Sequence, residues 1–196
     1  MKNILILYYT QGGSTKKMAE TIALGVESAG ANAILRTVPN ISHNTEQTEP
    51  KIPKDGDLYA TKEDIANCDG IIIGSPAYFG NMAAALKFFL EKHSDLWFKG
   101  SLIGKPAGFF TSASSMHAGH ESTLLSMMIP FLHHGCLITG IPYSEQALEK
   151  TKTGGTPYGA SHLNTFSPQK TLSDDEIKIC KTLGKRIAEI AKKQSN

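Results

Sequence analysis

Short apolar runs alternate with amphipathic segments along the chain, a pattern typical of an α/β protein. Between the runs, apolar residues recur at helical spacing, as they do over 82–90. We therefore expect about five parallel strands in one sheet, covered by helices on both faces. The runs that predict buried strands are 4–9, 32–38, 70–74, 106–111 and 136–141.

The periodic segments continue without a linker-like break, so residues 1–196 are expected to form a single domain. Two stretches fit no regular element. Residues 39–60 are polar and contain three prolines, and residues 142–170 show no clear period. Irregular insertions are expected at both places.

Charge and cysteine content narrow the class of protein. The chain has 20 basic and 18 acidic residues, dispersed along its length, so nucleic acid is not expected as a partner. Its three cysteines are far apart, which favours reduced thiols. The start lacks the features of an export signal, and no apolar run approaches the roughly 20 residues of a membrane span. We expect a cytoplasmic protein with no membrane span.

The first predicted strand runs directly into a loop of glycines and hydroxyl side chains, followed by a helical pattern. Backbone N–H groups of such a loop and the positive end of the helix can all point at one anion. The loop lacks the lysine of a nucleotide-triphosphate loop and the glycine spacing of a dinucleotide fingerprint. Residues 10–15 carry no charge, which suits one phosphate monoester, and flavin mononucleotide (FMN) is the leading candidate; a plain turn is the alternative.

Two further loops follow strands in the same sheet. Ligands of open parallel sheets bind at the carboxyl ends of the strands, where the strand order reverses. In an order 2-1-3-4-5, loops 10–15 and 76–81 adjoin that point, and loop 111–119 lies beside them. Tyr78 and Phe79 offer an aromatic wall, although such a pair is also common in a core or at its rim. A planar ring system with a phosphate tail fits these loops.

Five segments, in order along nearly the whole chain, resemble one known family. The chain is similar to the tryptophan-repressor-binding-protein-like (WrbA-like) NAD(P)H:quinone oxidoreductases, which are flavodoxin-like proteins that carry FMN. The segments are Leu7–Thr10, Gly74–Met82, Leu96–Trp97, His133–Gly135 and Gly154–Ala160.

The resemblance implies a flavodoxin-like fold of order 2-1-3-4-5 and a set of cofactor-binding residues. It also implies that Trp97 lies over the substrate side, and that a tyrosine usual near the nicotinamide is replaced here by Gly12. The implied FMN contacts are Thr10, Gln11, Gly12, Gly13, Ser14 and Thr15 for the phosphate, Ala77, Tyr78, Phe79, Gly80 and Asn81 for the ring, Ser112, Ala113, Ser114, Ser115, Met116 and His117 for its polar edge, and His133.

The function that the resemblance implies is two-electron transfer from NADH or NADPH to quinones by a ping-pong hydride mechanism, in a homotetramer or homodimer. The catalytic residues expected are His133, which would stabilise the reduced ring, and Trp97, which would stack on planar substrates. A packing role for Trp97 and a favourable helix-end charge for His133 are the simpler readings of those residues alone.

The alternative function is a flavodoxin-type carrier of single electrons between protein partners. The near-neutral charge balance disfavours it, because carriers of that kind are acidic proteins with a strongly negative docking face. No metal site is expected, since His117 and His120 stand three residues apart without a third ligand at suitable spacing.

Overall fold

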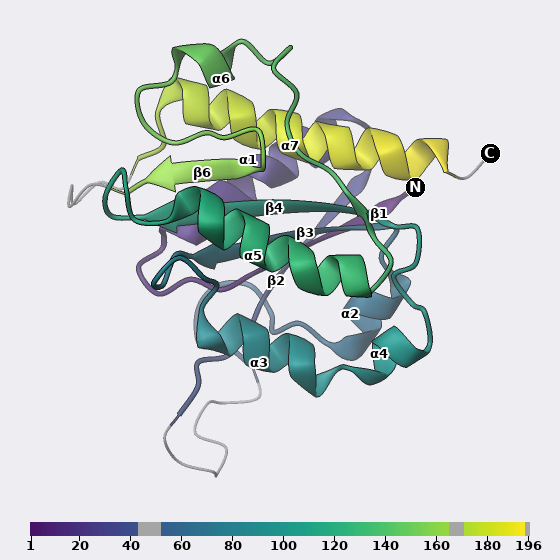
Figure 1. The fold of residues 1–196 in the computed structure, drawn as a ribbon. Coiled ribbons are helices and arrows are strands. Elements are labelled where there is room, and N and C mark those ends of the chain that lie inside the picture. The colour runs from purple at the N-terminus through teal and green to yellow at the C-terminus, as the bar shows by residue number, and fades with distance from the viewer. Residues whose placement is uncertain (43–51, 165–170, 195–196) are drawn as a thin grey trace.

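Parallel strands form one sheet through the middle of the protein (Figure 1). The computed structural model describes residues 1–42, 52–164 and 171–194. The strands in these residues are β1 (Asn3–Tyr8), β2 (Asn32–Thr37), β3 (Gly70–Pro76), β4 (Pro106–Ala113), β5 (Leu137–Ile138) and β6 (Ala160–Leu163). The helices are α1 (Ser14–Ser28), α2 (Lys62–Asn67), α3 (Ala84–Lys92), α4 (Asp95–Phe98), α5 (His120–His133), α6 (Ala147–Lys150) and α7 (Asp174–Lys193).

The strand order is β2-β1-β3-β4-β5, with β6 also paired to β4, so the predicted order is confirmed. The central strands β3 and β4 are buried along almost their whole length. Strands covered on both faces need apolar residues at successive positions, which explains the run Ile71–Ile73. The parallel pairing brings the carboxyl ends of β1, β3 and β4 to one edge of the sheet.

Helices cover both faces of the sheet, as predicted. Ile4 and Ile6 of β1 point into a core shared with α1 and α7, whereas Leu5 and Leu7 point into a core shared with α3 and α5. Figure 1 shows α7 and α1 on one side of the strands and α3 on the other. None of the helices in the described ranges is long and apolar enough to cross a membrane.

The edge of the sheet beside β4 differs from the expectation of five strands. β5 pairs with Pro106 and Ala107 only, and is shorter than the predicted run 136–141. Beyond Thr139 the chain turns away, because the Ile141 N–H donates to the carbonyl of Pro157 and not to β4. The sixth strand, β6, then returns to pair with Phe110–Ala113.

The two stretches expected to be irregular contain some regular structure. In the described part of 39–60, Tyr59 forms a parallel bridge to Thr37 and so continues the edge of the sheet at β2. The stretch 142–170 contains α6 and β6, and residues 165–170 lie outside the described part. Regular elements there were missed because each spans only four residues.

A buried carboxylate anchors the start of α7. Glu176 accepts N–H bonds from Ser173 (2.7 Å), Gly154 (2.8 Å) and Leu163 (3.0 Å), and lies 3.1 Å from Nδ1 of His162. Although burial alone would raise its pKa, these bonds and His162 lower the pKa of Glu176 to about 2. One side chain therefore ties β6, α7 and the loop at Gly154 together.

Replacing this carboxylate should change how stability depends on pH. The pKa of Glu176 in the folded state lies below its ordinary value, so its contribution is present above about pH 4.5 and is lost as pH falls toward about 2. Glu176→Gln should lower the free energy of unfolding by roughly 3 kcal/mol at neutral pH and by less in acid. Urea denaturation at a series of pH values measures both.

Glu189→Gln on the same helix is the matched control, because Glu189 is exposed and only forms a loose ion pair with Lys185 at 3.9 Å. It should change stability little at any pH. If the free energy of unfolding falls by the same amount from neutral to acid pH in wild type and in Glu176→Gln, this role of Glu176 is contradicted.

Candidate functional site

Three loops at the carboxyl edge of the sheet enclose a hollow of about 240 Å³. They follow β1, β3 and β4, so the structure brings together residues from all three loops that the sequence singled out. The residues that line the hollow are Thr10, Gln11, Gly12, Ser14, Thr15, Pro76, Ala77, Tyr78, Ser112, Ala113, Ser114 and Asn164.

The loop between β1 and α1 is built to present donors. Gly13 has φ of 90°, a left-handed conformation that glycine adopts without strain, and its N–H donates to Oγ1 of Thr10 at 3.0 Å. No side chain in the described ranges caps α1, and its first turn contains no acidic residue. The first N–H groups of a helix have no partner within the helix, so this end suits an anion.

Within that loop Ser14 carries a buried polar atom. Its Oγ has no hydrogen-bond partner in the described ranges, although the residue is almost completely buried. Buried hydroxyls are normally paired, so a group from outside the chain fits beside it. The donor set is therefore one of neutral groups suited to a phosphate.

Buried hydroxyl groups join the three loops beneath the hollow. Oγ1 of Thr15 lies 3.1 Å from Oγ of Ser112, and the Thr111 hydroxyl donates to the carbonyl of Ser75 at 2.8 Å. The Ala77 N–H donates to the carbonyl of Ser112 at 2.9 Å. These bonds hold the ends of β3 and β4 and the start of α1 in a fixed arrangement.

The segment after β3 makes a tight turn that presents an aromatic side chain to solvent. Tyr78 and Asn81 exchange backbone hydrogen bonds, and between them Phe79 and Gly80 both have positive φ, 51° and 75°. Positive φ is costly for a bulky residue such as Phe79, which is fully exposed. Strain of this kind clusters at ligand sites, so Phe79 is a candidate for contact with a ligand.

A second hollow of about 640 Å³ adjoins the first, and Thr10, Gln11 and Tyr78 line both. The Tyr78 hydroxyl donates to Oε1 of Gln11 between them. The other residues around this larger hollow are Tyr9, Asn40, Ile41, Phe79, Ala83, Ala84 and Ala85.

Several residues expected at the flavin do not line either hollow. Gly13 and Gly80 shape their loops, and Asn81 accepts bonds from the Met82 N–H and the Ser126 hydroxyl. Ser115, Met116 and His117 lie exposed in the loop before α5.

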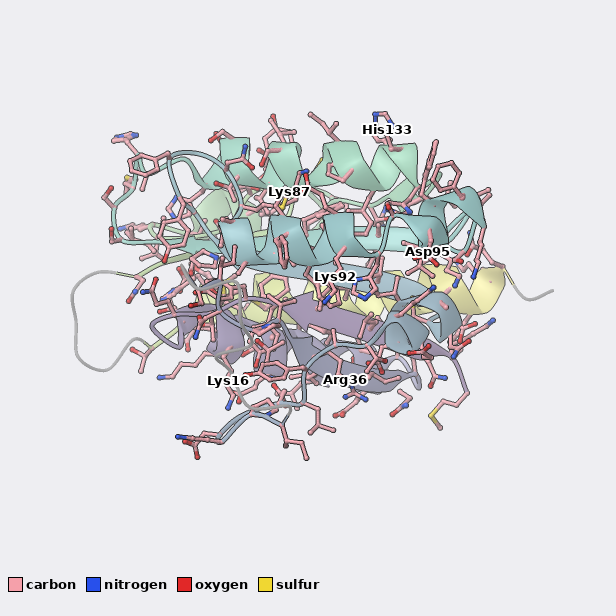
Figure 2. The ribbon with its side chains drawn as sticks, turned by 90° about the horizontal axis from the view of Figure 1, so that it is seen from below. Lys16, Arg36, Lys87, Lys92, Asp95 and His133 are labelled. Atoms are coloured by element: carbon pink, nitrogen blue, oxygen red, sulfur yellow. The ribbon has the colours of Figure 1, made fainter. Side chains whose placement is uncertain are left out.

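Trp97 and His133 lie together, but away from the three loops. The Trp97 indole N–H donates to the backbone carbonyl of His133 at 2.7 Å, and both line a hollow of about 270 Å³ between α3 and the end of α5. Figure 2 shows His133 at the C-terminal end of α5. Since α5 begins beside Gly80 and rises about 1.5 Å per residue, His133 lies about 20 Å along the helix from the loops.

Sequence reasoning missed the contribution of β6 to this edge. The Asn164 N–H donates to the carbonyl of Ala113 at 2.7 Å, which places Asn164 at the hollow. His162, two residues earlier, pairs in register with Ser112. The four-residue strand Ala160–Leu163 has no hydrophobic pattern that could have predicted either position.

Comparison with known proteins agrees with this geometry. Residues 2–146 match the family model described as NADPH-dependent FMN reductase. The NAD(P)H dehydrogenase (quinone) of Geobacter sulfurreducens is 38% identical, over 97% of this chain and 98% of that protein. The protein of the same name from Gluconacetobacter diazotrophicus is 37% identical over the full length of both.

Solved structures share the fold. The flavodoxin, WrbA-like protein from Agrobacterium tumefaciens has a TM-score of 0.70 at 22% identity, covering 98% of this chain and 99% of that chain. A flavodoxin from the domain Archaea has a TM-score of 0.63 at 17% identity, covering 97% and 99%. The expected flavodoxin-like fold and family resemblance are thus confirmed, and the chain belongs to the NADPH-dependent FMN reductase family, with the NAD(P)H dehydrogenases (quinone) among its relatives.

Proposed function

We propose that this chain is an FMN-dependent oxidoreductase that transfers two electrons from NADH or NADPH to quinones. Its family and the names of its relatives support FMN as cofactor, NAD(P)H as donor and a quinone as acceptor. The observation that carries the proposal is the hollow at the carboxyl edge, where uncapped α1 N–H groups and the unpaired Ser14 hydroxyl fit a phosphate monoester. The chemistry that FMN supplies when bound is acceptance of a hydride and return of two electrons.

The proposed roles of the residues follow from their places around the hollows. Thr10 to Thr15 hold the phosphate with backbone N–H groups and hydroxyls, and Ala77 to Phe79 line the ring. Ser112 to Ser114 present backbone to its polar edge, while Ser115 to His117 complete that loop. Gly80 and Asn81 hold the turn that carries Phe79.

The larger hollow suits both substrates in turn. Tyr9, Tyr78 and Phe79 offer aromatic faces on which a nicotinamide or a quinone stacks, and Gly12 leaves the phosphate loop free of a bulky side chain there. One space shared by two planar substrates requires that the oxidised nicotinamide leaves before the quinone enters. A ping-pong order is therefore part of the proposal.

We also propose a homo-oligomer in which Trp97 and His133 complete the site of a neighbouring subunit. Their separation from the loops within one chain supports this, as do exposed apolar side chains on the same side of the protein. Phe88 of α3 and Leu125, Ile129 and Leu132 of α5 are all about half exposed or more. A second copy of the chain would cover this surface.

The remaining parts of the proposal concern the whole chain. We propose a single domain, supported by the two cores that share one sheet. A cytoplasmic location is supported by Cys68, Cys136 and Cys180, which are buried and unpaired.

Steady-state kinetics of the FMN-loaded protein test the reaction. NADH or NADPH should be oxidised rapidly only when a quinone is present, and double-reciprocal plots at several quinone concentrations should be parallel.

Ser14→Ala should bind FMN about tenfold more weakly, because it removes one hydrogen bond to a charged group. Thr21→Ala is the control, since its hydroxyl bonds to Lys17 on the exposed side of α1. Absence of quinone-dependent turnover would contradict the reaction, and intersecting lines would contradict the ping-pong order.

Subunit mixing tests the shared site. Ser14→Asp puts a negative charge at the phosphate position but is compatible with a helix start, so it should fold without holding FMN. A second variant carries Trp97→Ala and His133→Ala. After equal amounts are unfolded and refolded together, random pairing into dimers should restore about a quarter of wild-type activity. Activity no higher than that of the two variants refolded separately would contradict a site shared between subunits.

A further inference from the structure

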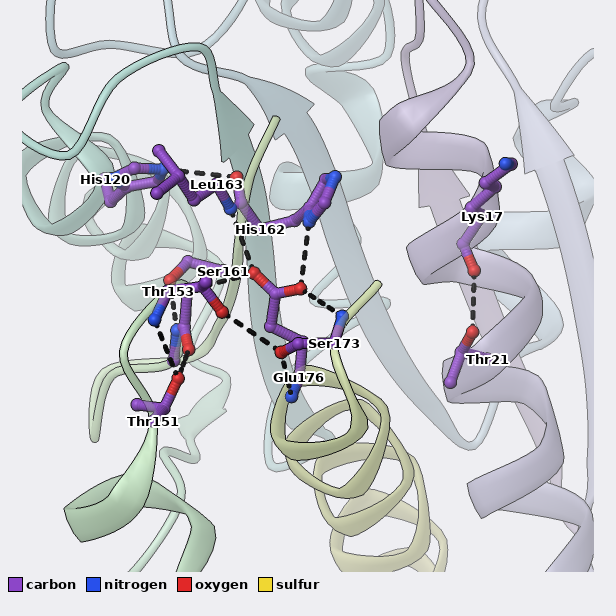
Figure 3. Close-up of polar contacts among 12 residues, drawn as sticks. Lys17, Thr21, His120, Thr151, Thr153, Ser161, His162, Leu163, Ser173 and Glu176 are labelled. Atoms are coloured by element: carbon purple, nitrogen blue, oxygen red, sulfur yellow. Dashed lines mark hydrogen bonds and ion pairs between the residues drawn. The ribbon is translucent and has the colours of Figure 1, made fainter. Parts of the chain in front are cut away.

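His162 of β6 lies next to Ser112, one of the residues that line the proposed phosphate site. His162 of β6 pairs in register with Ser112 of β4, and neighbouring residues in register point to the same face of a sheet. Ser112 in turn contacts Thr15 in the first turn of α1, with the two hydroxyl oxygens 3.1 Å apart. In Figure 3 the His162 ring lies between Glu176, at the start of α7, and helix α1. His162 therefore stands between the starts of α1 and α7.

Nδ1 of the His162 ring is hydrogen-bonded to Glu176. The carboxylate already accepts three backbone N–H bonds, and its Oε2 lies 3.1 Å from Nδ1 of His162, with 2% and 1% of the two side chains exposed. An ionised carboxylate only accepts hydrogen bonds, so Nδ1 carries a hydrogen and donates it. A second titratable group, His120, lies nearby, with its Nε2 3.3 Å from the backbone carbonyl of His162.

The other nitrogen has no partner. Nε2 of His162 and Oγ of Ser14 are both buried and unpaired within the part of the chain that the structure describes. Both residues are neighbours of the hydroxyl pair Thr15–Ser112, since Ser14 precedes Thr15 in the chain and His162 pairs in register with Ser112. Leaving two buried polar atoms unpaired is unfavourable. A polar ligand group at the proposed phosphate site would give both atoms a hydrogen-bond partner.

We propose that His162 is a positioning residue for the phosphate end of FMN, held by Glu176 so that its Nε2–H donates to the phosphate directly or through the Ser14 hydroxyl. With Nδ1–H bonded to Glu176, an Nε2–H exists only in the imidazolium form. In this proposal the FMN-bound form holds an imidazolium beside a loop in which residues 10–15 carry no charge, with the Glu176 carboxylate as its counter-ion. The inference rests on the proposed function, since it takes FMN as the ligand.

Two substitutions separate the two nitrogens. His162→Asn keeps a donor near the Nδ1 position, facing Glu176, but removes Nε2 and the charge. His162→Gln keeps a donor near the Nε2 position but removes the charge and the Nδ1 donor to Glu176. A residue that merely supports the fold through Glu176 would tolerate the first change better than the second, whereas a phosphate ligand would tolerate the second better.

The measurement is flavin binding to the flavin-free protein, with FMN and riboflavin compared for each variant. Riboflavin has the same ring system without the phosphate, so the ratio of its dissociation constant to that of FMN isolates the phosphate contact. His162→Asn should raise the FMN dissociation constant about 10- to 100-fold and the riboflavin value by less than about threefold. His162→Gln should raise the FMN value about 3- to 10-fold. His93→Asn, a partly buried histidine at the end of α3, should change neither.

Equal effects on both flavins, or no effect on either, would overturn the role of His162. Thermal unfolding of each flavin-free variant first shows whether it folds. If His162→Asn does not fold, the ratio of the riboflavin to the FMN dissociation constant in His162→Gln decides. An unchanged ratio would overturn the role of His162, and a ratio at least about threefold lower would support it. If wild-type protein binds FMN no better than riboflavin, the phosphate site itself fails, which separates failure of the proposed function from failure of this inference.

Discussion

Parallel pairing of β1, β3 and β4 brings three strand ends to one edge of the sheet, where buried hydroxyl groups need hydrogen-bond partners. Thr15 meets Ser112, and Thr111 reaches the carbonyl of Ser75. These contacts pair the hydroxyls of Thr15, Ser112 and Thr111, whereas the Ser14 hydroxyl has no partner within the described residues. The arrangement of the site is therefore a consequence of satisfying polar groups at the edge of the sheet.

The donors that remain define what the site can bind. Neutral backbone and hydroxyl groups suit a single phosphate, and no lysine in the loop reaches for further phosphates, as a nucleotide-triphosphate loop requires. Phe79, held in a strained and exposed turn, supplies an aromatic face at the mouth of the site. Beside the site, His162 of β6 bonds through Nδ1 to Glu176, and both side chains are almost completely buried. Selectivity for a flavin monophosphate thus comes from placement more than from net charge.

Much of the fold could be predicted from the sequence, because the central strands and the helices that cover them are long and strongly periodic. β6 could not, since four residues including a serine and a histidine pair with β4 only through tertiary contacts. The loops that line the hollow were predicted from strand ends and small residues. The exposure of Ser115 to His117, and the distance of Trp97 and His133 from the loops, depend on loop paths and helix length that residue types do not reveal.

The claim that the three strand ends form one phosphate-anchored flavin site is tested most directly by hydrogen–deuterium exchange with and without FMN. Backbone amides of a loop that contacts the ligand exchange more slowly when it is bound. FMN should slow exchange together in 10–16, 76–81 and 112–115, and riboflavin should protect the first segment much less. Protection confined to one of these segments, or equal protection of 10–16 by both flavins, would contradict the claim.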